Sequence, residues 1–133
     1  MKNIYIFGLL LSLFLVSCDD MEDKLKPVVD TGAAEPTQLY ILSEGLFNSN
    51  NSTLATYDLT TKALVTDYFL AANKRGLGDT GNDMGIYGSK LYVVMNVSSQ
   101  VEVVDVKTGK SLAQIAMFDD KAVAREPRYV EFY

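Results

Sequence analysis

From about residue 39 onward the sequence predicts an all-β fold, on the basis of two observations. Apolar residues recur there with a period near two in short runs, and Gly, Asn, Asp, Ser and Thr separate the runs, which is typical of strands joined by turns. The runs also repeat along the chain. The predicted strands are residues 39–43, 53–58, 64–69, 84–87, 91–96, 101–105 and 112–117.

The N-terminus has the pattern of a secretory signal peptide. Lys2 supplies a positive charge, and residues 4–16 form an unbroken run of 13 apolar and small residues. A stable membrane-spanning helix takes roughly 20 apolar residues, so this run is too short to span a bilayer. We therefore expect residues 1–17 to be a removable leader.

The leader ends at a sequence that resembles a bacterial lipobox. Leu15-Val16-Ser17-Cys18 offers a branched apolar residue, a tolerant position, a small residue and the thiol that accepts diacylglycerol. Cys18 is the one cysteine of the chain, so a lipidated Cys18 leaves no free thiol. We expect Cys18 to hold the protein on its membrane, since two or more acyl chains give stable anchoring.

Residues 18–38 have the composition of a tether. Four of the five residues 19–23 are acidic and must stay solvated, and residues 25–38 carry two of the three prolines. One interpretation of the acidic run is a flexible spacer. The other is an address, because acidic residues behind the lipidated cysteine resemble the surface-export signal of Bacteroidetes lipoproteins.

The internal repeat predicts the arrangement of the strands. Residues 39–42 correspond to residues 91–94, at a spacing of 52, and residues 57–62 correspond to 104–110, at a spacing of 47 or 48. Each unit has a strand, a polar loop, a second strand that ends in Asp, a tight turn and a third strand. Units of this length with about four strands fit the blades of a β-propeller.

The tight turns have a local chemical explanation. The Asp58 and Asp105 carboxylates can accept the backbone N–H two residues later, and Gly109 can supply a positive φ.

With these units defined, the chain from Leu39 to Tyr133 resembles the YncE-like, or YVTN-type, β-propellers. Their blades have a Leu-Tyr-Val strand, a Val-Asp-x-x-Thr-Gly-Lys turn and a Pro-Arg opening of the next blade. Some stretches are more similar still to the propeller lipoproteins of gut Bacteroidetes. These are residues 40–45, 50–52, 78–84, 86–92 and 101–105.

Length distinguishes this chain from that family. A closed propeller of this kind has about seven blades, within a general range of roughly four to eight, whereas two units are recognisable here. Residues 125–133 resemble the opening of a third. We therefore expect about two four-stranded blades plus the first strand of a third, as in a fragment or a truncated reading frame, because two blades alone leave unpaired strand edges.

Loop length suggests where a ligand would bind. Residues 44–52, 96–100, 70–82 and 118–126 form long polar connections at one end of the blades, whereas the opposite end has short turns at 60–63, 88–90 and 107–110. Binding residues concentrate on long loops held by a rigid scaffold. The candidate contacts are Phe47, Asn48, Asn50, Asn51, Lys74, Arg75, Asn96 and Arg125.

Three motif matches lack the context that their chemistry needs. Residues 76–81 fit the dinucleotide string GxGxxG but follow no strand–helix pattern. Asp79, Gly81 and Asp83 recur as in a calcium loop, yet Lys90 occupies its twelfth position. Residues 28–33 and 79–81 are similar to the aspartic-protease string, but the first copy lies in the tether and the second lacks the preceding apolar pair.

Composition narrows the function classes. Removal of residues 1–17 takes away Lys2 and no acid, so the net charge goes from −5 to −6, which argues against a nucleic-acid partner. The chain has no His and no Trp, so we expect no zinc site and assign no catalytic residue, metal or cofactor.

We expect a binding protein on the cell surface that captures a nutrient for an outer-membrane transporter. The resemblance implies a TonB-dependent transporter as partner and a small-molecule ligand, since similar lipoproteins include corrinoid binders. The alternatives are an enzyme of the lyase or quinoprotein dehydrogenase type, which share the propeller, and a truncated fragment without function.

Overall fold

The computed structural model describes residues 36–133 of the 133-residue chain. The predicted leader, the lipidation site Cys18 and all of the tether before residue 36 lie outside the described residues.

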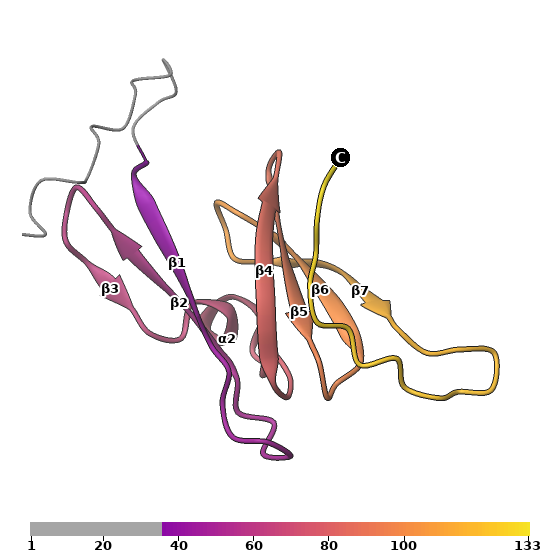
Figure 1. Cartoon of the computed structure of the whole chain (residues 1–133). Coiled ribbons are helices and arrows are strands. Elements are labelled where there is room, and N and C mark those ends of the chain that lie inside the picture. The colour runs from indigo at the N-terminus through magenta and orange to yellow at the C-terminus, as the bar shows by residue number, and fades with distance from the viewer. Residues whose placement is uncertain (1–35) are drawn as a thin grey trace, which may run out of the picture. The chain divides into compact units, whose positions relative to one another are not determined.

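The described residues form two antiparallel sheets and one short helix, so the predicted all-β class is confirmed (Figure 1). The first sheet has the order β1-β2-β3 and the second the order β4-β5-β6-β7. The strands are β1 (Gln38–Ser43), β2 (Thr53–Asp58), β3 (Leu64–Val65), β4 (Gly81–Tyr87), β5 (Lys90–Met95), β6 (Gln100–Asp105) and β7 (Ser111–Ala116).

The pairing register shows how the sequence repeat is built into the sheets. Leu42 of β1 pairs with Leu54 of β2, and Val94 of β5 pairs with Val101 of β6. Hence β5, β6 and β7 repeat β1, β2 and β3. The strand β4 pairs with the outer edge of β5 and has no counterpart beside β1 among the described residues.

The two tight turns form as the local chemistry predicts. Asp58 Oδ1 accepts hydrogen bonds from the backbone N–H groups of Thr60 and Thr61 at 2.8 and 2.7 Å. Asp105 Oδ1 accepts from the Lys107 and Thr108 N–H groups at 3.2 and 2.8 Å, and Gly109 has a φ of 70°. Both turns are set by residues within a few positions of the aspartate, which is why the sequence reveals them.

The third predicted strand is wrong over most of its length. Residues 64–69 were expected to be extended, but β3 ends at Val65 and the helix α2 (Tyr68–Asn73) follows. Helix-forming Leu and Ala occupy its centre, and its Phe69 side chain is 1% exposed in the core. The helix ends at Lys74, which adopts a left-handed conformation with φ 58°.

Two further expectations about blade completeness also need correction. The first sheet has three strands rather than four. Residues 125–133, predicted to hold the first strand of a third blade, contain no strand, because a strand requires a backbone partner and this segment has none in the described chain.

The hydrophobic core lies between the two sheets. Its buried members come from β2, α2, the 74–80 segment, β5 and β6, and Tyr40, Leu42, Tyr68 and Met84 pack against it. They are Leu54, Phe69, Leu77, Leu91, Val93, Met95 and Val104. One face of each sheet is therefore buried against the other sheet.

Candidate functional site

The long loops meet at one end of the two sheets, as the loop lengths predict. The Ser52 N–H donates to the Gly78 carbonyl at 3.2 Å, and the Asn96 N–H donates to the Thr80 carbonyl at 2.8 Å. The Gly81 N–H donates to the Ser52 hydroxyl at 2.9 Å. We call the three connections 44–52, 76–80 and 96–99 the loop end of the molecule.

Asp79 is the residue that organises the loop end. Its side chain is buried, with 8% of the residue exposed. Oδ2 accepts the Asn50 N–H at 3.1 Å and Oδ1 accepts the Thr80 hydroxyl at 2.8 Å, while the Ser98 hydroxyl accepts the Asp79 N–H at 2.8 Å. Both carboxylate oxygens are thus engaged in holding loops together, which fits a structural role rather than that of a catalytic acid.

Four of the candidate contacts lie on the 44–52 loop. Phe47 is 72% exposed, and Asn48 and Asn50 have left-handed backbone with φ of 58° and 49°, a conformation that Asn tolerates better than most residues. Asn51 has a structural task, because its Oδ1 accepts the Leu46 N–H at 2.7 Å. Of these four candidates, Phe47, Asn48 and Asn50 form no side-chain hydrogen bond within the described residues and are exposed.

An apolar cavity opens beside this loop. It encloses about 190 Å³ and has polar groups from Asn50, Asn51 and Asp67 at its margin. Its apolar wall comes from β2, α2 and the 76–80 connection, through Leu54, Phe69, Leu70 and Leu77. Ligand pockets usually measure about 300–1,000 Å³, so this cavity can enclose part of a ligand, with the rest lying on the surrounding loops.

Arg75 forms an ion pair with the buried Glu102, a contact that the sequence did not predict. Its Nη2 donates to Glu102 Oε1 at 2.8 Å and to the Ser111 hydroxyl at 3.0 Å, and its guanidinium lies 4.9 Å from the centroid of Phe69. The Ser111 hydroxyl also donates to Glu102 Oε1. Glu102 is fully buried, and its Oε2 atom has no hydrogen-bond partner among the described residues.

The Arg75 cluster therefore ties α2 to the second sheet. The signal in the sequence was one carboxylate, Glu102, within an otherwise apolar strand. Lys74, beside it, is exposed and serves as the C-cap of α2 through its backbone, so its side chain is available whereas that of Arg75 is largely occupied.

The last two candidate contacts hold the C-terminal segment. Asn96 is 7% exposed, and its Nδ2 donates to the carbonyls of Glu126 and Pro127 at 2.8 and 3.1 Å. The Arg125 N–H donates to the Ser99 hydroxyl at 2.8 Å, and its guanidinium pairs with Asp119 at 3.0 Å. A ligand-binding role for either residue stays a prediction.

At the opposite end, Tyr40 of β1 and Tyr68 of α2 connect the first sheet and the helix to the end of β6. The hydroxyls of Tyr40 and Tyr68 donate to the Val106 carbonyl at 2.6 and 3.1 Å. Burial, together with the neighbouring Tyr68 and Asp105 groups, raises the pKa of Tyr40 to about 12. Burial also raises the pKa of Tyr68, so both phenols are neutral donors at physiological pH.

The described residues leave the rejected motifs without support. Residues 76–80 form a connection that leads into β4 and opens no helix. In residues 36–133, no group of three or more His, Cys, Asp or Glu side chains is placed to hold a metal ion. Within the same residues, no helix is long and apolar enough to cross a membrane.

No family model matches the chain, and no curated protein matches it. Of the candidate contacts, Asn50 and Asn51 line the cavity, and Phe47 and Asn48 lie on the same loop. Asn96 and Arg125 lie at the C-terminal segment, and Arg75 lies in the ion pair with Glu102.

Proposed function

We propose that this chain is a surface-anchored lipoprotein whose propeller-type blades bind a small molecule at the loop end. The cavity beside residues 44–52 is the observation that supports binding most directly, since it combines an apolar wall with amide groups at its margin, the usual make-up of a small-molecule site. The anchor follows from the lipobox at Cys18.

The blade assignment is supported by the repeat. Two consecutive antiparallel sheets pack face to face with equivalent strands in equivalent order, and consecutive blades of a propeller have this relation. The function as a nutrient binder for a TonB-dependent transporter rests on the resemblance described above.

A corrinoid is the ligand that the resemblance favours. A molecule of that size exceeds the cavity of about 190 Å³, so it would lie across the loop end with one substituent inserted beside Asn50. The side chain of Phe47, 72% exposed on the same loop, would then stack on or cover the ring.

Isothermal titration calorimetry with cyanocobalamin tests the ligand. We expect micromolar or tighter binding that Phe47→Ala weakens by about tenfold, because one exposed aromatic contact contributes about 1–2 kcal/mol. The control is Leu64→Ala, a residue of β3 that is 57% exposed beside the short 60–63 turn at the opposite end. Absence of heat with the full chain would reject the corrinoid, and equal affinity of the two variants would reject this loop as the site.

The anchor has its own test. Replacement of Cys18 by Ser removes the thiol that lipid attachment requires, so the variant should stay unprocessed and leave the outer-membrane fraction. Retention of the Cys18→Ser chain in that fraction would contradict the lipoprotein assignment.

A further inference from the structure

The outer face of the first sheet is exposed where its repeat counterpart is buried. Leu39 and Ile41 of β1 are 46% and 44% exposed, whereas the equivalent residues of β5, Leu91 and Val93, are 1% and 0% exposed. The residue types are matched, so the difference comes from what covers each strand.

The second sheet shows what such a face requires. The edge of β5 is paired with β4, and its inward face packs against Tyr40, Leu42 and the rest of the first sheet. By the repeat, β1 needs a strand at its free edge and an apolar sheet against its outer face. Neither is supplied by the described residues.

A groove marks the place of the missing strand. It runs between β1 and β4, is lined by Tyr40, Ile41 and Leu42 on one side and by residues 81–84 on the other, and measures about 600 Å³. It continues past Leu39 as a second hollow of about 320 Å³. A strand bound to the edge of β1 would fill both, as β4 fills the equivalent position beside β5.

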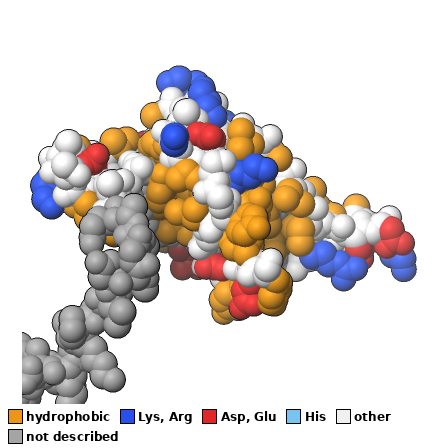
Figure 2. All heavy atoms as spheres, turned by 90° about the horizontal axis from the view of Figure 1, so that it is seen from above, with side chains coloured by type: hydrophobic (Ala, Val, Ile, Leu, Met, Phe, Trp, Pro, Cys, Tyr) orange, Lys and Arg blue, Asp and Glu red, His pale blue; other side chains and the backbone are white. Residues whose placement is uncertain are grey.

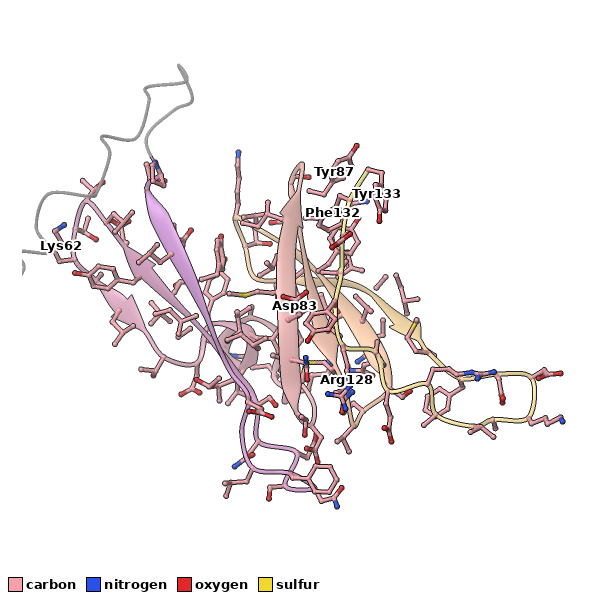
Figure 3. All side chains as sticks on the ribbon, viewed as in Figure 1. Lys62, Asp83, Tyr87, Arg128, Phe132 and Tyr133 are labelled. Atoms are coloured by element: carbon pink, nitrogen blue, oxygen red, sulfur yellow. The ribbon has the colours of Figure 1, made fainter. Side chains whose placement is uncertain are left out.

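Residues 128–133 form no strand within the single chain, but they are an unpaired segment in the required place. It lies against β4 through side-chain contacts (Figure 3): Asn82 Nδ2 donates to the Arg128 carbonyl at 2.9 Å, and the Val130 N–H donates to Asp83 Oδ2 at 2.9 Å. Phe132 stacks on Tyr87 with ring centroids 5.3 Å apart.

The direction of this segment is also the required one. Arg128 lies beside the start of β4 and Phe132 beside its end, so the segment runs parallel to β4. Because β4 is antiparallel to β5, the segment is antiparallel to any strand that takes the position of β5 in a following blade. In the repeat, the strand equivalent to β5 is β1.

The apolar side of the segment faces the second sheet, and more apolar surface surrounds it. Phe132 lies 5.1 Å from Tyr92 between ring centroids. By the pairing register, Ile115 of β7 lies on the same face of the sheet as Tyr92, and it is 47% exposed. Figure 2 views the molecule from above and shows hydrophobic side chains exposed over the middle of that view. The outer face of the second sheet is thus apolar, as is the face of the first sheet that buries Leu91 and Val93.

We propose that a second copy of this chain docks here, with its β1 pairing to residues 128–133 of the first copy. The first sheet of the second copy then packs on the second sheet of the first, which repeats the contact already present inside each chain. Residues 128–133 of one copy and β1, β2 and β3 of the next copy then form a four-stranded blade together. The inference rests on the repeat geometry and is independent of the ligand and anchor proposed above.

The contact is head-to-tail, so it continues until a ring closes. Such a ring leaves no β1 edge unpaired.

The mass of the full chain in mild detergent, measured by light scattering, tests the association. We expect an oligomer that Ile41→Lys dissociates at least about tenfold more readily, since burial of an Ile side chain is lost, while Val123→Lys leaves it intact. Ile41 is 44% exposed in the single chain, so the variant should fold, and its circular dichroism spectrum checks this. A monomer at all concentrations, or equal behaviour of the two variants, overturns the proposal.

Cross-linking tests the head-to-tail arrangement. In the second sheet, Tyr87 at the end of β4 pairs with Lys90, which is the repeat counterpart of Gln38. Residues 128–133 take the place of β4 in the next blade, so residue 133 at their end corresponds to Tyr87. Residue 133 of one copy should therefore lie near Gln38 of the next. In a Cys18→Ser background, chains with Gln38→Cys mixed with chains with Tyr133→Cys should give a covalent dimer with a short bis-maleimide. Dimers from Gln38→Cys chains alone, or none from the mixture, overturn the arrangement.

Discussion

Replacement of Arg75 by Met removes the charge that neutralises the buried Glu102. The Glu102 side chain is fully buried and one of its oxygens already lacks a hydrogen-bond partner among the described residues, so the variant leaves an uncompensated carboxylate. Removal of one partner of a fully buried pair costs about 3–5 kcal/mol. Since the Arg75 side chain is 38% exposed and water screens it in part, we expect a loss of about 2–3 kcal/mol.

Urea denaturation followed by far-ultraviolet circular dichroism measures this loss, because the chain has no Trp for fluorescence. Protein concentration is held fixed, since association shifts apparent stability. Lys121→Met on the exposed hairpin is the matched control and should change stability by less than about 0.5 kcal/mol.

The double variant Arg75→Met with Glu102→Met separates the explanations. If the cost of Arg75→Met arises from the stranded carboxylate, the double variant should recover to within about 1 kcal/mol of the wild type, since apolar replacement of a buried pair is often neutral. The reasoning is refuted if Arg75→Met behaves like Lys121→Met, or if the second substitution adds its own cost instead of restoring stability.

Three further predictions concern packing at other sites. Burial raises the pKa of Tyr40 from 10.0 to about 12, so the stability that its neutral phenol contributes is complete below pH 10 and is lost as pH rises toward 12. In a pH series of urea denaturation curves, Tyr40→Phe should reduce this alkaline loss of stability by about 1 kcal/mol after allowance for solvent screening. Gly109→Ala should cost about 2–3 kcal/mol, as φ is 70° and a Cβ would lie 2.9 Å from the Tyr68 ring, whereas Gly88→Ala, with φ 61° and open space, should cost about 1 kcal/mol; equal melting curves would contradict this. Asn96→Ala should raise amide exchange across residues 125–133, because two hydrogen bonds to that segment are lost; unchanged exchange there would refute its role.

The parts of the fold that depend on near neighbours were predictable from sequence. The turns at Asp58 and Asp105 need a carboxylate and N–H groups two or three residues away, and six of the seven predicted strands follow from alternation. The helix α2 was missed because residues 64–69 were grouped with the period-two runs, although their order Leu-Val-Thr-Asp-Tyr-Phe does not alternate strictly. The burial of Phe69 in the core decides the outcome. Tertiary packing therefore overrode the local pattern.

The candidate site was predictable only in outline. Loop length correctly indicated which connections meet at one end. Loop length could not show that the side chains of Arg75, Asn96 and Asn51 form hydrogen bonds within the protein. The partners of Arg75 and Asn96 are distant in sequence, and the bond of Asn51 to Leu46 depends on how the loop itself folds. From sequence, Asp79 was considered only as part of the calcium-loop and aspartic-protease patterns. In the structure both of its carboxylate oxygens accept hydrogen bonds that hold the loops together.

The central claim is that this chain is displayed on the cell surface through a lipid on Cys18. The most direct measurement is mass spectrometry of the N-terminal peptide from the outer membranes of intact cells treated with an external protease. The account predicts that residues 36–133 are digested from outside while a peptide that begins at a diacylglyceryl-modified Cys18 stays in the membrane. Recovery of an undigested chain that still carries residues 1–17, or of an unmodified Cys18, would contradict it.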